Sequence, residues 1–347
     1  MIADKTIRTT IKPIAKLVIW ENGQMAIQRN RQMRHWFYAP SYNRQTSGLC
    51  NKIIAFWHSQ SSNCKINPVC VWKTIQINGQ LTALAAISIT QLNIFKMKKE
   101  ALFIAFSTQK GGMGKTALTV LSASYLHYVK GYNVAVIDCD YPQHSIVEMR
   151  ERDVEQVKNN LYYKQLAYIQ FKTLQKKAYR VEESNAADAI EVAERLKQES
   201  DLDFIFFDLP GTLNTKGVVK TLAMMDYVFI PISADRVVLE STLQFATTIH
   251  DNLITTGKSN IKDLYLIWNM VDGRERTELY NAYDGAIQEL GLQTMQTIIP
   301  DTKRFHREMT EANRPVFRST LLPVDKTLAK GSNMEELVNE IITITQK

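Results

Sequence analysis

The sequence predicts an α/β fold, with a predominantly parallel, doubly wound sheet and helices on both of its faces. Two observations predict it. Short apolar runs alternate with amphipathic stretches, and a glycine-rich loop joins the first clear run to a helix. Continuous apolar runs are typical of parallel strands that are buried on both faces. This prediction covers residues 97–347, and a basic extension, residues 1–96, precedes them.

The charge of the chain changes at about residue 96. Residues 1–96 hold two acidic residues, Asp4 and Glu21, against twelve Lys and Arg, whereas the whole chain carries a net charge of +7. This composition, with scattered Cys and Trp and weak periodicity, favours a disordered or non-native segment, an upstream over-extension with Met97 as a natural start. An auxiliary nucleic-acid arm and a small folded domain stay open as alternatives. Strands could form at residues 12–20 and 69–77, and a strand or helix at 81–95.

Other features exclude several classes of protein. The four cysteines are too few and too irregularly spaced for a disulfide scaffold or a zinc site. No window reaches 18 uninterrupted apolar residues, and the N-terminus lacks the pattern of a secretory signal. We therefore expect a cytoplasmic protein without a membrane-spanning helix.

The first motif with a chemical function follows the apolar run that begins at residue 101. Residues 101–107 (ALFIAFS) read as a buried strand, residues 108–116 (TQKGGMGKT) as a loop, and residues 116–129 as a helix that Gly131 stops. This is the context of a phosphate-binding loop, in which backbone N–H groups surround phosphate oxygens, Lys115 neutralises their charge and the Thr116 hydroxyl binds Mg²⁺. The alternative is a glycine-rich turn with two solvated lysines. The predicted nucleotide-binding residues of the loop are Lys110, Gly111, Gly112, Met113, Gly114, Lys115, Thr116 and Ala117.

Carboxylates follow two further apolar runs. Residues 133–137 (NVAVI) lead into Asp138 and Asp140, and residues 203–207 (DFIFF) lead into Asp208 and Gly211. Acidic side chains at the carboxyl ends of buried strands suit a magnesium site. The alternative for the first pair is that the two aspartates cap a helix or close a turn.

The remaining pattern continues the alternation of strands and helices. Strands are predicted at residues 227–232, 264–268 and 297–299, and helices near residues 237–252 and 275–290. The insert at residues 145–198 is helix-rich. A last helix is predicted from Ser332 to about Thr345, with Ser332 and Glu335 forming a capping box.

The loop departs from the standard pattern G-x-x-x-x-G-K-[ST], because Gln109 stands where the first glycine is expected. Residues 110–116 (KGGMGKT) instead resemble the deviant phosphate-binding loop of the ParA/MinD superfamily of ATPases. The resemblance implies that Lys110 reaches across a homodimer interface to the nucleotide of the partner. It also implies the cofactors ATP and Mg²⁺.

Roles for the other site residues follow from the same resemblance. Asp140 positions or activates the attacking water, and Asp138 supports the magnesium shell. The expected catalytic residues are Lys110, Lys115 and Asp140, and the expected metal ligands are Thr116, Asp138 and Asp208. The commoner family form is D-x-D-P-Q, and here Tyr141 is inserted before Pro142. We therefore make no prediction for the contacts of Gln143.

The base-binding residues are also inferred from the superfamily. Asn269 occupies the place of an adenine-reading asparagine, and Pro300 and Asp301 follow the next strand, where residues often line the base. Met270 stands where a guanine-binding motif has Lys, although Asp272 keeps its place. We therefore expect ATP rather than GTP.

Within the superfamily, residues 138–145 (DCDYPQHS) and 208–212 (DLPGT) resemble the ParA-like proteins called TraA, from conjugative transposons of Bacteroides-type bacteria. The resemblance implies a dimer around ATP that binds DNA without sequence preference, is released by hydrolysis and is often stimulated by a ParB-like partner. A conjugation protein is a further possible partner, and association with the nucleoid is possible. The DNA-binding candidates form one basic stretch: Lys303, Arg304, Arg307, Arg314 and Arg318. The alternative for this stretch is a solvated helix and loop.

Particular residues distinguish the chain from other classes of protein in the superfamily. A MinD-type membrane cycler needs a basic amphipathic C-terminal helix, whereas the last helix here holds Glu335, Glu336 and Glu340, so we expect no membrane partner. A tyrosine kinase of the superfamily would have C-terminal tyrosines, but none follows Tyr283, and Cys139 alone cannot bridge a metal cluster as in a nitrogenase-like protein. A nucleotide-gated binding module with negligible turnover and a MinD-type positioning ATPase stay open.

Overall fold

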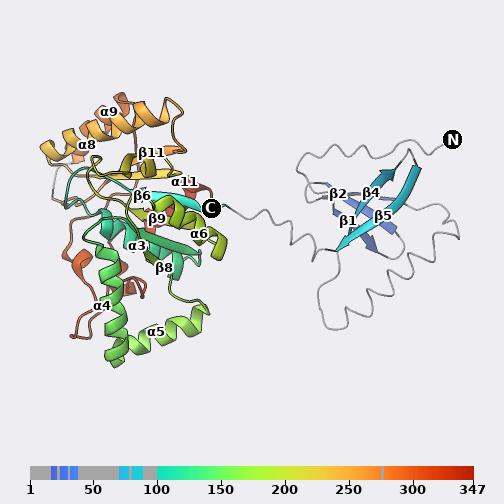
Figure 1. Ribbon diagram of the computed structural model, residues 1–347, viewed down its shortest axis with the longest axis horizontal. Helices are drawn as coiled ribbons and strands as arrows, with labels where there is room; N and C mark the ends of the chain where they lie inside the picture. The colour runs from blue at the N-terminus through green and yellow to red at the C-terminus, as the bar shows by residue number, and fades with distance from the viewer. Residues whose placement is uncertain are drawn as a thin grey trace. The chain divides into compact units, whose positions relative to one another are not determined.

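The chain divides into two compact units, residues 1–98 and 99–347, in the computed structural model (Figure 1). The structure describes five strands of the first unit, and residues 100–274 and 277–347 of the second. Strands β1 (Leu17–Glu21), β2 (Gln24–Arg29) and β3 (Gln32–Phe37) form an antiparallel sheet, and β4 (Cys70–Ile77) pairs antiparallel with β5 (Gln80–Ser88). Strands β1, β4 and β5 overlap the three segments where a strand, or for 81–95 a strand or helix, was considered possible, whereas β2 and β3 were not predicted. The expectation that residues 1–96 are disordered or an over-extension falls largely outside the described residues and stays a prediction.

The described part of the second unit contains the predicted parallel sheet. Its seven strands are all parallel and lie in the order β12-β11-β10-β6-β9-β7-β8. The first strand of this unit, β6, is therefore central, which is the doubly wound arrangement. The strands are β6 (Leu102–Phe106), β7 (Val134–Asp138), β8 (Arg180–Glu183), β9 (Phe204–Asp208), β10 (Tyr227–Ile232), β11 (Asp263–Trp268) and β12 (Gln293–Thr294).

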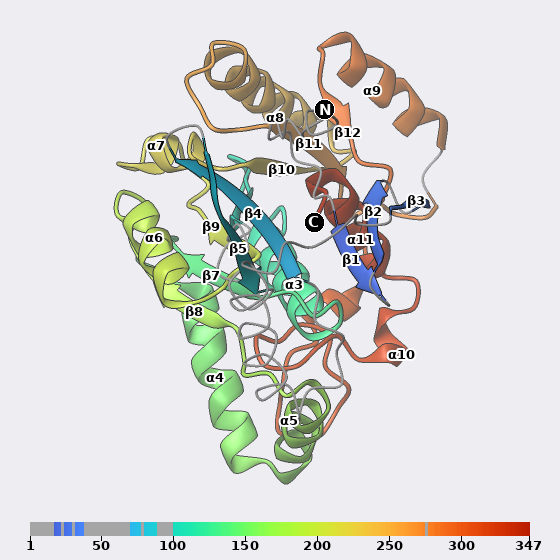
Figure 2. The same ribbon diagram turned by 90° about the vertical axis from the view of Figure 1, so that its right-hand side faces the viewer.

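Helices cover both faces of this sheet, as predicted (Figure 2). In β6, Phe103 and Ala105 belong to one core, and Ile104 and Phe106 to the other, because successive side chains of a strand point to opposite faces. The first core is closed by α6 (Ala189–Glu199), α7 (Val218–Leu222), α8 (Arg236–Ile249) and α9 (Thr277–Glu289). The second is closed by α3 (Lys115–Tyr128), α11 (Met334–Thr345) and the first turns of α4 (Ser145–Asn159).

Three local predictions were incomplete or wrong. Strand β8 was not predicted, because its sequence RVEE lies at the sheet edge and has no apolar pattern. Residues 297–299 are not a strand, since β12 lies at 293–294, although the Ile299 N–H still donates to the Trp268 carbonyl at 2.8 Å. The capping box also fails: Asn333 is the N-cap of α11 and makes no side-chain capping bond, and Glu335 instead bonds Lys130.

The predicted helix-rich insert contains α4, α5 (Leu161–Leu174) and α6, with β8 between the last two. A buried network connects α4 to the C-terminal segment. One oxygen of Asp153 accepts bonds from the Ser319 hydroxyl at 2.9 Å and from the N–H and hydroxyl of Thr320 at 2.7 and 2.8 Å. Arg150 donates to the Thr320 carbonyl at 3.0 Å. The middle of α4 is therefore fixed against residues 319–320.

Shorter helical turns complete the second unit. A π-helical turn, η1 (His250–Ile254), continues α8, and η2 (Lys303–His306) is a 3₁₀ turn. Helix α10 (Lys326–Ala329) precedes α11. Among the described residues, no helix combines the length and apolar character needed to cross a membrane.

Candidate nucleotide-binding site

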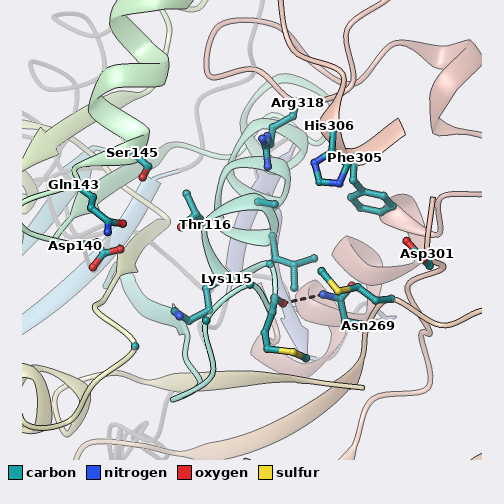
Figure 3. A pocket seen from close by; sticks show the side chains of 18 of the residues that line it. Lys115, Thr116, Asp140, Gln143, Ser145, Asn269, Asp301, Phe305, His306 and Arg318 are labelled. Atoms are coloured by element: carbon teal, nitrogen blue, oxygen red, sulfur yellow. Dashed lines mark hydrogen bonds between the residues drawn. The ribbon is translucent and has the colours of Figure 1, made fainter. Parts of the chain in front are cut away.

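A cavity of about 570 Å³ lies where the strands of the large sheet end. The loop after β6 forms its floor, and the segments after β7, β9 and β11 form its walls. Figure 3 shows Asp140, Gln143 and Ser145 on one side of Lys115 and Thr116, and Asn269, Asp301 and Phe305 on the other. Parallel α/β sheets bind ligands at this edge, where connections to neighbouring strands diverge.

The loop has a backbone shape that requires glycine. Gly112 and Gly114 have φ values of +76° and +79°, in the left-handed region that glycine adopts without strain. A Cβ on Gly114 would also lie 3.0 Å from Nδ2 of Asn269. That same Nδ2 donates to the Met113 carbonyl at 2.9 Å, as Figure 3 shows. Asn269 therefore lines the cavity and also holds the loop in its curved shape.

Thr116 lines the cavity, and Asp208 lies buried behind it. The Thr116 hydroxyl donates to Oδ2 of Asp208 at 2.8 Å, while Oδ1 of Asp208 is buried without a hydrogen-bond partner. The pKa of Asp208 is raised to about 7, mainly by burial; nearby Asp138 and Asp140 add to the rise, and the bond from Thr116 opposes it. A buried carboxylate oxygen without a donor, beside a hydroxyl, fits a hard cation such as Mg²⁺.

The residues fit a cation that arrives with its nucleotide. Among the described residues, no three His, Cys, Asp or Glu side chains converge to form a metal cage. Magnesium is usually bound through one or two carboxylates together with substrate phosphates, and such a site needs no cage of protein ligands. Thr116 and Asp208 would hold the ion in this arrangement.

Asp138 has a different geometry from Asp208. Its Oδ2 accepts the N–H groups of Ile146 at 2.8 Å and Val147 at 3.1 Å, and its Oδ1 accepts the N–H of Asp140 at 3.3 Å. Burial raises the pKa of Asp138, while the three backbone bonds lower it. The carboxylate therefore binds the first turn of α4, which is the helix-capping alternative considered for this pair.

The two lysines of the loop are placed differently. Lys115 lines the cavity, and a Cβ on Gly211 would lie 3.1 Å from its Nζ. Gly211 therefore leaves room for this lysine at the end of β9. Lys110 is not among the residues that line the cavity, and its N–H is 3.4 Å from the Thr108 hydroxyl oxygen. Of the two, only Lys115 is among the residues that line the cavity.

A profile of the CobQ/CobB/MinD/ParA nucleotide-binding domain matches residues 104–316, which is more than half of the chain. The chain belongs to this family. The matched residues begin within β6, contain the other six strands of the sheet and the loop, and end two residues before Arg318, which also lines the cavity.

Solved structures match this chain at low identity. The MinD cell division protein of Aquifex aeolicus is 18% identical, with 71% of this chain and 98% of that chain covered and a TM-score of 0.46. A plasmid partition protein from Borrelia burgdorferi is 16% identical, with 72% and 99% covered and a TM-score of 0.44. Cobyrinic acid a,c-diamide synthase from Mycobacterium smegmatis, with bound ATP analogue and magnesium, is 18% identical, with 72% and 96% covered and a TM-score of 0.47. No curated protein matches the sequence.

The far wall of the cavity was only partly predicted. Asn269, Pro300 and Asp301 line it, and Gln143, whose contacts were left open, lines the opposite wall. Sequence reasoning missed the wall residues of the 3₁₀ turn η2. Phe305 of this turn packs edge-on against a buried phenylalanine of the core at 4.8 Å between ring centroids. The additional wall residues include Thr302, Phe305 and His306.

The basic stretch does not form one free patch. Arg304 donates to the carbonyls of Leu328 at 2.9 Å and Lys330 at 2.5 Å, so it closes the end of α10. Arg318 bonds Glu308 at 2.6 Å and lines the nucleotide cavity. The remaining candidates, Lys303, Arg307 and Arg314, are exposed. A run of arginines in a sequence gives their charge but not their partners.

Proposed function

We propose that this chain is an ATP-dependent, dimerising switch ATPase of the partition or conjugation type. It binds DNA without sequence preference in its ATP state, is released by hydrolysis and serves a plasmid or mobile element in the cytoplasm. A ParB-like or conjugation protein would stimulate the turnover. The finer kinship, to the TraA proteins of conjugative transposons, is supported by the sequences of residues 138–145 and 208–212.

The observation that carries this proposal is the different placement of the two loop lysines. Lys115 lines the cavity of its own chain, whereas Lys110 lies in the same loop but outside that cavity. A lysine placed beside the cavity is free to serve the nucleotide of a second copy. This supports a dimer whose two nucleotides lie at the interface, because each loop then supplies a cation to both sites.

Hydrolysis needs an acceptor for the attacking water, and Asp140 is the carboxylate at the cavity wall for that role. The bond between its N–H and Asp138 fixes its backbone. Magnesium would be held by Thr116 and Asp208, and it would neutralise the charge that develops on the phosphate oxygens. Lys115 adds a second positive charge on the same phosphates.

The choice of ATP over GTP is supported at two positions. Met270 lines the cavity where guanine-binding proteins have a lysine. Asp272, which would read guanine, is bonded to Arg274 at 2.5 Å and is not among the residues that line the cavity. Guanine would therefore lack its usual carboxylate acceptor. Asn269 supplies an amide group on the same wall, which suits the edge of adenine.

DNA binding in this proposal depends on the exposed cations of the basic stretch. Lys303, Arg307 and Arg314 are available to phosphates, while Arg304 and Arg318 have partners within the chain. Contacts of this kind weaken steeply with salt and do not depend on sequence. Replacing Arg307 and Arg314 by Glu should reduce DNA retention and leave ATP binding unchanged. Equal retention would exclude this stretch.

The decisive experiment is sedimentation of the full chain carrying Asp140→Ala, with ATP, Mg²⁺ and duplex DNA. We expect a trapped dimer bound to DNA, because ATP binds but cannot be hydrolysed. Lys110→Ala should remain monomeric while still binding ATP, and Lys258→Ala, at an exposed lysine remote from the loop, is the matched control. A Lys110→Ala protein that dimerises like the parent would contradict the switch. Single-turnover hydrolysis with and without DNA distinguishes an ATPase from a binding module without turnover.

A further inference from the structure

Helix α5 is exposed along one side and packed along the other. It lies at the far end of α4 from the sheet, in both views of the ribbon (Figures 1 and 2). On its inner side Tyr163 is fully buried in a cluster with Met309, Val316 and Leu322. Gln170 of the same side donates to the Leu321 carbonyl at 2.9 Å. The helix is therefore firmly seated, and its other side is a fixed surface.

That other side carries exposed apolar side chains among polar ones. Contiguous exposed apolar side chains mark interaction surfaces more often than scattered ones do. The exposed apolar side chains of α5 are Leu161 (69%), Leu166 (36%), Tyr168 (64%), Ile169 (59%) and Phe171 (50%). We call this exposed side, together with the lysines it contains, the outer face of α5.

Two lysines stand within this outer face. Leu161, Lys164, Gln165, Tyr168 and Lys172 have the spacing i, i+3, i+4, i+7 and i+11, which places them in one stripe along the helix. Ile169 and Phe171 flank the stripe. The lysines therefore lie between apolar groups and not along their border.

The chain segment that contains the outer face has charges of one sign. Residues 156–180 contain no Asp or Glu, and Lys164 and Lys172 have no ion-pair partner among the described residues. Such a surface favours a partner whose carboxylates meet the lysines while its apolar groups cover the rings. The basic residues of this stretch are Lys158, Lys164, Lys172, Lys176, Lys177 and Arg180.

We propose that the outer face of α5 docks an acidic amphipathic helix of a partner protein. Its apolar side would cover Leu161, Tyr168 and Phe171, and its carboxylates would pair with Lys164 and Lys172. This inference stands independently of the proposed switch function, because it uses no residue of the nucleotide cavity.

Other occupants fit the charges and the apolar groups less well. A second copy of α5 would place its own two lysines against Lys164 and Lys172, and residues 1–96 are also strongly basic. A lipid surface favours lysines along the border of an apolar face, whereas here they stand inside it. Duplex DNA would pair with the lysines but gain nothing from Ile169 or Phe171, because its backbone offers phosphates and not apolar pockets.

The test uses random peptides of about 16 residues, roughly four helical turns, displayed on phage and selected on the full chain. We expect the enriched peptides to carry net negative charge with apolar residues at helical spacing. Their affinity should fall about tenfold or more for Lys164→Glu/Lys172→Glu and for Tyr168→Ala/Phe171→Ala. The matched control, Lys258→Glu/Lys330→Glu, changes two exposed lysines elsewhere and should bind like the parent.

Several results would overturn the proposal. Peptides that are neutral or basic, or that bind the α5 variants as well as the parent, would refute it, as would a selection that enriches none. Two further probes are vesicles containing phosphatidylglycerol and a DNA duplex of about 30 base pairs. If the α5 substitutions abolish binding to either probe and leave peptide binding unchanged, the outer face belongs to that other ligand. ATP binding of each variant, measured in parallel, shows that it is folded.

Discussion

Asp138 offers the sharpest test of the site, because its geometry and its expected role differ. The superfamily resemblance implies that it supports the magnesium shell, whereas its carboxylate accepts three backbone N–H groups, from Asp140, Ile146 and Val147. Those of Ile146 and Val147 belong to the first turn of α4, where helical N–H groups have no partner of their own. Asp138→Ala would leave all three without an acceptor.

The cost can be worked out from these contacts. A buried donor left unsatisfied costs about 1–3 kcal/mol, and the carboxylate also stabilises the helix N-terminus by about 0.3–1 kcal/mol. Ile146 is fully buried, while Val147 and Asp140 are partly solvated and regain some of their bonds from water. We therefore expect Asp138→Ala to lower the free energy of unfolding by about 3–5 kcal/mol. ATP turnover should fall as well, since Asp140 loses its anchor.

Asp138→Asn separates the two roles. Its amide oxygen can replace Oδ2 and accept the bonds of Ile146 and Val147, but its NH₂ group would face the N–H of Asp140. A positioning role predicts a loss of about 1–2 kcal/mol and slower turnover, with the Mg²⁺ dependence of ATP binding unchanged. Urea unfolding and ATP titrations at several Mg²⁺ concentrations measure these quantities. Asp153→Asn, a buried aspartate of α4 remote from the cavity, is the control. If Asp138→Asn is as stable as the parent but needs about tenfold more Mg²⁺, the positioning argument is refuted.

Three further predictions concern the floor of the cavity. Burial raises the pKa of Asp208 from 3.8 to about 7, so between these pH values the folded chain holds a proton that the unfolded chain releases. Without nucleotide, the free energy of unfolding should therefore fall between about pH 4 and pH 7, by up to about 1.4 kcal/mol per pH unit. Asp208→Asn should remove this pH dependence of the free energy of unfolding. Urea unfolding at several pH values measures it, and an unchanged pH dependence in the variant would contradict the prediction. Affinity for Mg²⁺–ATP should rise over the same window, because the cation needs the carboxylate; calorimetry showing no rise would count against Asp208 as a ligand. Gly114→Ala should weaken ATP binding at least about tenfold, because its Cβ would lie 3.0 Å from Nδ2 of Asn269 and break the bond of this amide to the Met113 carbonyl. Gly257→Ala, at a remote glycine with φ +66°, controls for backbone strain alone.

The sheet was predictable from the sequence because burial on both faces leaves a local signal. The central strands β6, β9 and β10 are apolar runs whose identity needs no knowledge of their neighbours. The edge strand β8, with the sequence RVEE, has no such signal, since its pairing with β7 depends on the fold already being formed. Similarly, β12 is two residues long, and its position depends on β11.

The site was predictable to the extent that one local motif determines it. The loop, Thr116 and Asp208 follow from a strand, a glycine-rich turn and the carboxyl end of a neighbouring strand. The wall made by Phe305 and Arg318 does not, because these residues reach the cavity through a 3₁₀ turn and an ion pair with Glu308. The arginines of that stretch carried a charge signal, and the signal could not distinguish a surface patch from a cavity wall.

Helix α4 connects these separate parts of the molecule. Its first turn is bound by Asp138, beside the wall that holds Asp140, and its middle is bound through Asp153 to residues 319–320, which follow Arg318 on the opposite wall. Its last residue lies two positions before α5. Because a helix is stiff along its axis, we expect a displacement of its first turn to reach the Asp153 network and the outer face of α5. The same element therefore joins both walls of the cavity to the surface proposed for a partner, which is the physical basis on which nucleotide state and partner binding can be coupled.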